Sequence, residues 1–176
     1  MGGDDAAKQH YVTKVTNLFG EAATLLGSIP AAQPGATWNK NGVLLEIGHG
    51  VTPTGGMDPG AIGINPKNEY ELNKIAAVAA QRLIRQAGVP CDLTDAVASL
   101  RSLGERAAGY DVFCSIHHNS ASAPAQGAEV LVCKSKSDPD DLQPSAMMSA
   151  EIAAELGIRD RIAGGRDPRL HLGILK

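Results

Sequence analysis

A short apolar run that leads into a glycine-rich loop and then a long amphipathic helix constrains this chain more than any other feature. Residues 43–47 read Val-Leu-Leu-Glu-Ile, which suits a buried parallel strand. A loop rich in Gly and Pro covers residues 48–66. Residues 69–87 then place apolar side chains every three or four positions, and Gly88 follows as a stop signal. The pattern predicts a strand–helix unit of an α/β protein.

The rest of the chain repeats this alternation. We expect further strands at residues 89–93, 111–116, 128–133 and 170–175, and further helices at residues 99–108 and 144–156. Strands that alternate with helices predict a single α/β domain, with a mostly parallel or mixed twisted sheet and helices on both faces.

The first forty residues differ from the rest of the chain. Apolar positions within residues 5–29 recur every three or four residues, which predicts an N-terminal amphipathic helix. Residues 31–42 are polar and read as a linker. The expected organisation is therefore a helix and linker at 1–40 and a main domain at 41–176.

Composition excludes several classes of function. The chain has 176 residues, a net charge of −3, one Trp, three Tyr and two Phe, which argues against nucleic-acid binding. No run reaches the roughly 18 apolar residues that a membrane span needs. Asp4 and Asp5 stand where a secretory signal would be positive, so no signal peptide is predicted. Three widely spaced Cys indicate reduced thiols, and the oligomeric state is not indicated.

Two histidine segments follow predicted strands. His49 lies between Gly48 and Gly50 after the first strand, and His117 directly follows the strand at 111–116. Ligand sites of such sheets lie beyond the carboxyl ends of the strands. Together with Glu69 at the head of a helix, the two histidines would make a catalytic zinc set with an open fourth position. The wide spacing matches no short local motif, so structural histidines remain the alternative.

Neighbouring polar residues have simpler interpretations. His118 is expected to point away from His117 along the strand, and Glu71 is the rival ligand if the loop register differs. Asp58 lies in an Asp-Pro-Gly segment and is interpreted as a turn residue. Arg106 is expected to pair with a carboxylate, whereas Asn119 could orient a ligand or bind substrate.

Several segments together resemble a known family. These are Gly48-His49-Gly50, the Asp-Pro-Gly-Ala-Ile-Gly loop at 58–63, Glu69 at the start of its helix, Ser-Ile-His-His-Asn at 115–119 and Gly-Ala-Glu-Val at 127–130. In order and spacing, from about residue 43 to 135, they resemble the zinc-dependent N-acetylmuramoyl-L-alanine amidases of the Amidase_3 type.

The resemblance implies that His49, Glu69 and His117 bind Zn²⁺. It further implies hydrolysis of the amide bond between N-acetylmuramic acid and L-alanine, with peptidoglycan stem peptide and glycan as partners. Such an autolysin or endolysin acts on the cell wall outside the cytoplasm. We therefore expect phage-type delivery, another export route or a removed leader. The family's segments argue against a third interpretation, a metallo-carboxypeptidase-like peptidase.

Two departures from the family affect the chemistry. Glu46 stands where the family has Asp, and it could accept the second N–H of a ligand histidine or form an ion pair at the strand edge. The family's general base is a Glu in a C-terminal strand, which is expected beyond Lys176, so the domain is expected to lack its last strand. Within the chain, Glu129 and Glu46 are the candidates for a substitute base.

The resemblance leaves two functions and three supporting residues to test. Asn119, Glu46 and Arg106 are the candidates for substrate contacts or for support of the metal ligands. The missing Glu leaves an alternative function open, a non-catalytic, zinc-containing module that binds peptidoglycan or regulates other proteins.

Overall fold

The computed structural model describes residues 41–63, 67–95, 99–118, 126–134, 139–165 and 167–170. The predicted N-terminal helix at 5–29 lies outside the described residues, as do Asn119 and residues 171–176. The chain divides into two compact units, which contain the described residues 41–118 and 126–170 respectively. Each unit is considered by itself.

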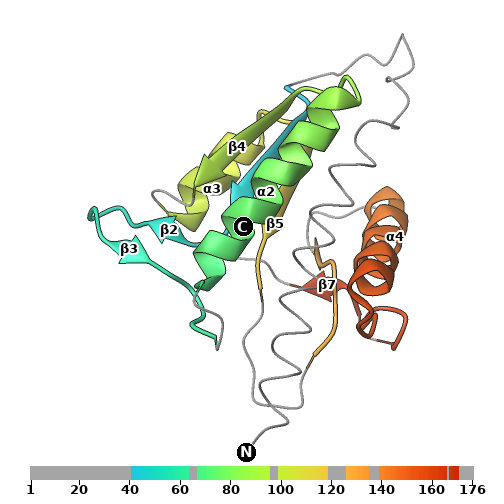
Figure 1. The fold of residues 1–176 in the computed structure, drawn as a ribbon. Helices are drawn as coiled ribbons and strands as arrows, with labels where there is room; N and C mark the ends of the chain where they lie inside the picture. Colours follow the sequence, from blue (N-terminus) through green and yellow to red (C-terminus); the bar gives the residue numbers. More distant parts are fainter. Residues whose placement is uncertain are drawn as a thin grey trace, which may run out of the picture. The chain divides into compact units, whose positions relative to one another are not determined.

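A parallel three-stranded sheet forms the centre of the first unit (Figure 1). Its order is β4 (Cys91–Asp95), β1 (Val43–Ile47) and β5 (Val112–Ile116). Strand β4 begins two residues later than predicted. Pro90 has no N–H to donate to a ladder, and its carbonyl instead accepts a hydrogen bond from Val43 N at 2.9 Å.

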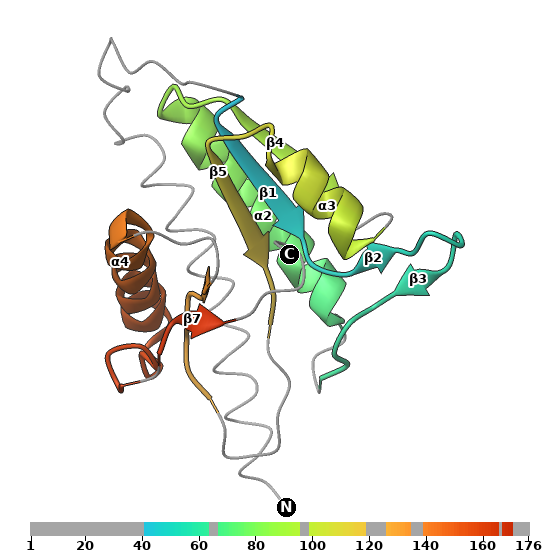
Figure 2. The same ribbon diagram turned by 180° about the vertical axis from the view of Figure 1, so that it is seen from behind.

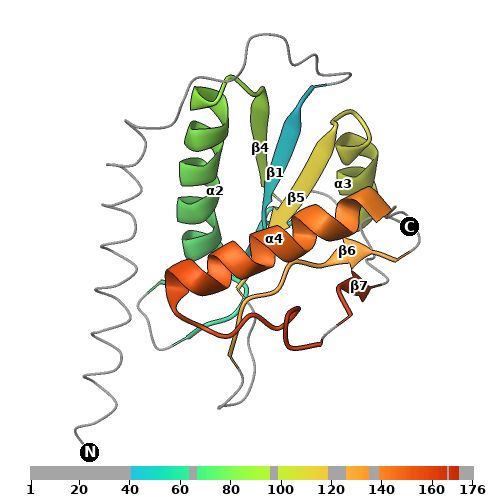
Figure 3. The ribbon, with the colours of Figure 1, turned by 90° about the vertical axis from the view of Figure 1, so that its right-hand side faces the viewer.

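Two helices pack on this sheet. Helix α2 (Glu69–Gln86) covers one face, and α3 (Leu100–Ala107) lies on the other (Figure 3). Both helices begin with a capping box, formed around Asn68 in α2 and Ser99 in α3, which satisfies free backbone N–H groups of the first turn. The predicted α/β class, with a parallel sheet packed against helices, is confirmed.

Side chains alternate along β1, so Val43 and Leu45 lie on one face of the sheet and Glu46 lies on the other. Val43 and Leu45 are buried with Cys91 of β4, against apolar side chains that include Cys114 of β5. The strand register places Glu46 directly between Thr94 and Ser115 of the neighbouring strands. Glu46 is the last but one residue of β1 and therefore lies near the carboxyl edge of the sheet.

The loop after β1 contains a small hairpin that the sequence did not predict. Strands β2 (Gly50–Val51) and β3 (Met57–Asp58) pair antiparallel, with Gly50 opposite Asp58. The hairpin extends from the carboxyl edge of the sheet (Figure 2). It brings the Asp-Pro-Gly segment back beside the end of β1.

The second unit is smaller. Strands β6 (Val132–Cys133) and β7 (Arg169–Leu170) pair in parallel, and α4 (Pro139–Leu156) packs near β6. Helix α4 begins five residues before the predicted start at Pro144. Pro144 is the sixth residue of this helix and removes one backbone hydrogen bond there, yet the helix continues through it to Leu156.

The predicted strand at 128–133 is observed as β6 and a separate bridge from Ala128 to Asp160.

Within the described residues, no helix combines the length and the apolar character needed to cross a bilayer.

Candidate metal centre

His49 leaves β1 in an unusual backbone conformation. Its φ is +69°, the left-handed region that residues other than glycine rarely adopt. Gly48 and Gly50 flank it, and Gly50 itself has a φ of +111°. The chain therefore reverses sharply at this point, which brings the imidazole over the carboxyl edge of the sheet. Backbone strain of this kind is concentrated at functional sites.

Glu69 is the first residue of α2 and is held by backbone donors. Its Oε2 accepts a hydrogen bond from Ala61 N at 2.9 Å, and its Oε1 accepts one from His118 N, also at 2.9 Å. Burial alone would raise the pKa of Glu69, but these two backbone N–H groups, with the neighbouring histidines, lower it overall. The carboxylate is thus ionised and fixed in direction.

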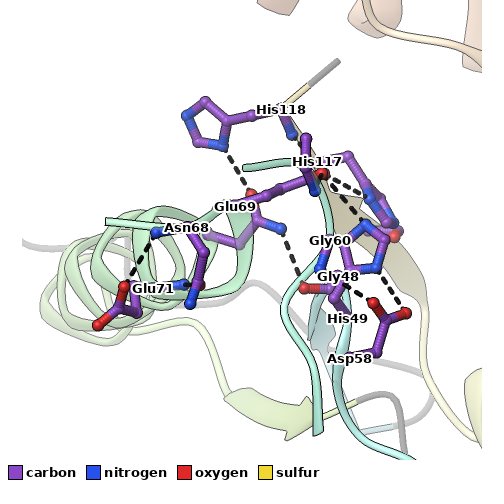
Figure 4. A network of polar contacts seen from close by, with 12 residues as sticks. Gly48, His49, Asp58, Gly60, Asn68, Glu69, Glu71, His117 and His118 are labelled. Atoms are coloured by element: carbon purple, nitrogen blue, oxygen red, sulfur yellow. Dashed lines mark hydrogen bonds and ion pairs between the residues drawn. The ribbon is translucent and has the colours of Figure 1, made fainter. Parts of the chain in front are cut away.

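Glu69 connects the two histidines of the predicted zinc set (Figure 4). His49 Nε2 lies 3.3 Å from Oε2, and His117 Nδ1 lies 3.1 Å from Oε1. The two imidazole rings meet edge to face, with centroids 4.9 Å apart. Ligand atoms of the three residues all lie within 4.8 Å of one another. The structure therefore brings together residues that the sequence separates widely.

Glycines make room for both imidazoles. A Cβ on Gly48 would lie 2.5 Å from His117 Cε1, and a Cβ on Gly60 would lie 2.5 Å from His49 Cδ2 and 2.8 Å from Glu69 Oε2. Real Cβ contacts are not this short. These two glycines are required by space, and Gly60 also by its φ of +66°.

Asp58 contacts the nitrogen of His49 that does not face Glu69. Its Oδ2 lies 2.9 Å from His49 Nδ1, while its Oδ1 accepts a hydrogen bond from Gly60 N at 2.9 Å. The turn role predicted for Asp58 is therefore only half of what it does. The hydrogen bond from His49 is the main cause of a lowered pKa of Asp58. Since an ionised carboxylate only accepts hydrogen bonds, Nδ1 of His49 carries a proton and Nε2 keeps a lone pair for a ligand.

The charge state of His49 follows from these neighbours. Partial burial would lower the pKa of His49, but Asp58 and Glu69 outweigh that effect and raise it. Without a metal, the imidazole is therefore protonated over a wider pH range than a free one.

Glu46 lies near the nitrogen of His117 that does not face Glu69. Its side chain is 2% exposed, it accepts a short hydrogen bond from Ser115 Oγ, and its Oε2 is 4.0 Å from His117 Nε2. Burial raises the pKa of Glu46, although Ser115 and the histidines oppose that effect. The carboxylate is therefore near a ligand histidine, as one of the two sequence-based interpretations anticipated.

The remaining candidates have other partners. Glu71 Oε2 accepts from Asn68 N at 2.9 Å and completes the capping box, which explains its presence without a metal. His118 Nδ1 lies 2.7 Å from the amide oxygen of Asn73.

Arg106 and Glu129 also have partners in the described residues. Arg106 donates to Thr94 Oγ1 at 2.9 Å. Glu129, in the second unit, forms an ion pair with Arg161 at 3.0 Å.

The donor set and spacing fit a zinc ion. Atoms that bind one tetrahedral zinc at about 2.0–2.2 Å lie about 3.3–3.5 Å from each other. His49 Nε2 lies 3.3 Å from Oε2 of Glu69 and His117 Nδ1 lies 3.1 Å from Oε1, and one ligand atom from each of the three residues lies within 4.8 Å of the other two. Two imidazoles and one carboxylate are also the ligands of a common type of catalytic zinc site, which keeps its fourth position open.

A parallel α/β sheet with two histidines and a carboxylate at its carboxyl edge defines the chain as a candidate metal-dependent hydrolase. Residues 43–175 match the N-acetylmuramoyl-L-alanine amidase family, Amidase_3, and the chain belongs to this family. The family is zinc-dependent, acts on the cell wall and implies a peptidoglycan substrate. Neither the curated proteins nor the solved structures yield a match.

Proposed function

We propose that His49, Glu69 and His117 hold one Zn²⁺ and that this site hydrolyses the amide bond between N-acetylmuramic acid and L-alanine. The observation that carries the proposal is the position of Glu69, whose two oxygens each face one histidine nitrogen at 3.1–3.3 Å. Family membership supplies the reaction. Bound zinc would act as a Lewis acid that polarises a water molecule and the scissile carbonyl.

The exposure of the three side chains indicates the direction of substrate approach. The side chain of Glu69 is 6% exposed, whereas those of His49 and His117 are 26% and 44% exposed. Peptidoglycan would therefore approach the metal from the side where His49 and His117 are exposed to solvent. Glu69 would bind the metal from the buried side. Asp58 keeps the Nδ1 proton of His49 in place during the reaction.

The proposed reaction also needs a general base. A base must reach the water that attacks the carbonyl. Glu46 is buried and hydrogen-bonded to Ser115, and Glu129 is paired with Arg161, so both have partners that suit structural roles. We therefore assign the role of base to neither of them. The partners of Glu46 and Glu129 favour a second function, binding of peptidoglycan without cleavage.

Digestion of purified peptidoglycan tests the proposal. We expect the chain to release stem peptides that begin with L-alanine, and to stop doing so when a chelator removes the metal. Mass spectrometry of the soluble products measures the release. One bound zinc per chain without release would instead support the binding function, whereas no zinc binding would contradict both functions.

Two carboxylates at the start of α2 provide a matched pair of variants. Glu69→Gln removes a proposed ligand and is expected to abolish tight zinc binding. Glu71→Gln lies two residues further along the same helix and keeps the capping box, because Gln is accepted at that position. It is expected to bind zinc like the unmodified chain. Equal zinc affinities in the two variants would contradict the ligand assignment.

A further inference from the structure

We propose that Glu46 is a positioning residue, which holds His117 by its Nε2 so that Nδ1 faces the metal, and that Ser115 holds Glu46 in place. The inference rests on the zinc site proposed above. It concerns how that site is supported by the sheet beneath it, and it assigns a role to a buried carboxylate that the family's ligand set leaves unexplained.

The strand register puts the three residues together. Glu46 lies opposite Ser115, because β1 and β5 pair in parallel. Ser115 and His117 are two positions apart along the chain, so they project on the same side where the strand ends. Ser115 Oγ donates to Oε2 of Glu46, and that same oxygen is the one 4.0 Å from His117 Nε2. One carboxylate oxygen therefore faces both groups.

The imidazole of His117 lies between two carboxylates. Its Nδ1 is 3.1 Å from Glu69 Oε1, and its Nε2 points towards Glu46. A neutral imidazole has one N–H, and a nitrogen that binds metal must offer its lone pair. If Nδ1 faces the metal, the proton is on Nε2 and needs an acceptor. Glu46 Oε2 is that acceptor, after a ring movement that closes the 4.0 Å separation.

Gly48 leaves the ring little freedom. A Cβ at this position would lie 2.6 Å from His117 Nε2, so the imidazole rests directly on the backbone at the end of β1. Only a short movement separates Nε2 from Glu46, the residue two positions earlier on that strand. Because Gly48 has no side chain, the imidazole fits at this place in the orientation observed.

The second histidine is supported in an equivalent way. Asp58 lies 2.9 Å from the nitrogen of His49 that does not face Glu69. Each proposed ligand histidine thus has one carboxylate towards the centre and another beyond its far nitrogen, at 2.9 Å for His49 and 4.0 Å for His117. An outer carboxylate of this kind fixes the tautomer and the ring direction, and its loss typically lowers metal affinity about 10- to 100-fold.

A buried carboxylate in a small sheet also demands an explanation. Burying an ionised group without good partners destabilises a protein, and an apolar side chain of similar size would pack at least as well. Glu46 is nevertheless fully enclosed between β4 and β5. Its function as an acceptor for His117 explains why a carboxylate is found at this position.

Zinc affinity and histidine NMR together test the proposal. Glu46→Gln keeps the size of the side chain, and Ser115→Ala keeps the carboxylate but removes its hydroxyl partner. Thr94→Val is the matched control, because Thr94 faces Glu46 from the opposite strand and is equally buried. Zinc dissociation constants are measured by competition with a chelator. NMR of labelled histidine in the zinc-loaded chain identifies which nitrogen of His117 carries the proton.

We expect the Nε2–H form of His117, a zinc affinity about 10- to 100-fold weaker in Glu46→Gln, and a smaller loss in Ser115→Ala. Thr94→Val should bind zinc about as tightly as the unmodified chain. Folded Glu46→Gln with unchanged affinity would overturn the proposal, and so would metal on Nε2 of His117. If Glu46→Gln does not fold, Ser115→Ala decides by the same criterion.

The outcome is separable from that of the proposed function. A chain that binds zinc but releases no stem peptide fails as an amidase, yet its variants still report whether Glu46 holds His117. A chain that binds no zinc overturns both proposals. Normal cleavage with unchanged zinc affinity in Glu46→Gln overturns the positioning role alone.

Discussion

Replacing Gly60 by alanine tests whether the loop after β3 shapes the metal centre. The new Cβ would lie 2.5 Å from His49 Cδ2, whereas ordinary contacts begin near 3.4 Å, so the two atoms must separate by about 1 Å. Metal–ligand distances tolerate only about 0.2 Å. The collision therefore has to move a proposed ligand out of place, since the Cβ would also lie 2.8 Å from Glu69 Oε2.

Gly55 provides the matched control for this change. Its φ is +82°, close to the +66° of Gly60, but a Cβ there would meet no atom within 4 Å. Both alanine variants should lose about 1–2 kcal/mol of stability from the backbone, because an L-residue in the left-handed region costs about that much, and Gly60→Ala should lose more because its Cβ also collides with His49 and Glu69. Only Gly60→Ala should also lose zinc affinity, by about tenfold or more.

Two measurements separate the effects. Thermal unfolding of the metal-free chains should give a decrease in Tm for both variants, of about 2–4 °C for each kcal/mol, and the larger decrease for Gly60→Ala. Competition with a chelator should give a normal zinc affinity for Gly55→Ala and a weakened one for Gly60→Ala. Equal and unchanged affinities in both variants would refute the claim that Gly60 is kept free of a side chain for His49.

Three further predictions concern His49 itself. The pKa of His49 is raised in the folded chain, so His49 stabilises the metal-free chain fully below its ordinary pKa of 6.5. This stabilisation is lost as the pH rises through the folded pKa. Tm measured against pH should show the loss, and Asp58→Asn should diminish it. Zinc must displace the same proton, so its affinity should fall as the pH is lowered through this raised pKa, and Asp58→Asn should shift that fall to lower pH. His49→Gly should be more stable than His49→Ala without metal, by about 1 kcal/mol in urea unfolding, because glycine accepts the φ of +69° at no steric cost; equal stabilities would show that the backbone at this position is not strained.

The sequence singled out His49, Glu69 and His117 as candidate ligands because those residues occur at recognisable places. A strand end and a helix start are visible as changes in apolar periodicity, and such ends meet at one edge of a parallel sheet. His49, His117 and Glu69 each occupy one of these places, and the structure brings them together. The approximate bounds of β1, β5 and α2 followed from the same patterns.

The register of the strands was less accessible to prediction. A shift of two residues in β4 does not alter which face its side chains occupy, so alternation alone could not locate its start. The alternation of β5 was sufficient to separate Cys114 from Ser115. It could not show that Ser115 would meet Glu46, because that contact depends on the pairing of β5 with β1.

The role of Asp58 shows which kind of information was missing from the sequence. Read locally, an Asp-Pro-Gly segment is a turn, and Asp58 does accept the hydrogen bond from Gly60 that such a turn needs. Its second role arises because β2 and β3 pair antiparallel and set Asp58 opposite Gly50, the residue after His49. Each strand of that hairpin has two residues, too few for alternation to be visible. A carboxylate nine positions after a ligand histidine is thus brought to its far nitrogen by backbone pairing that no side-chain pattern predicts.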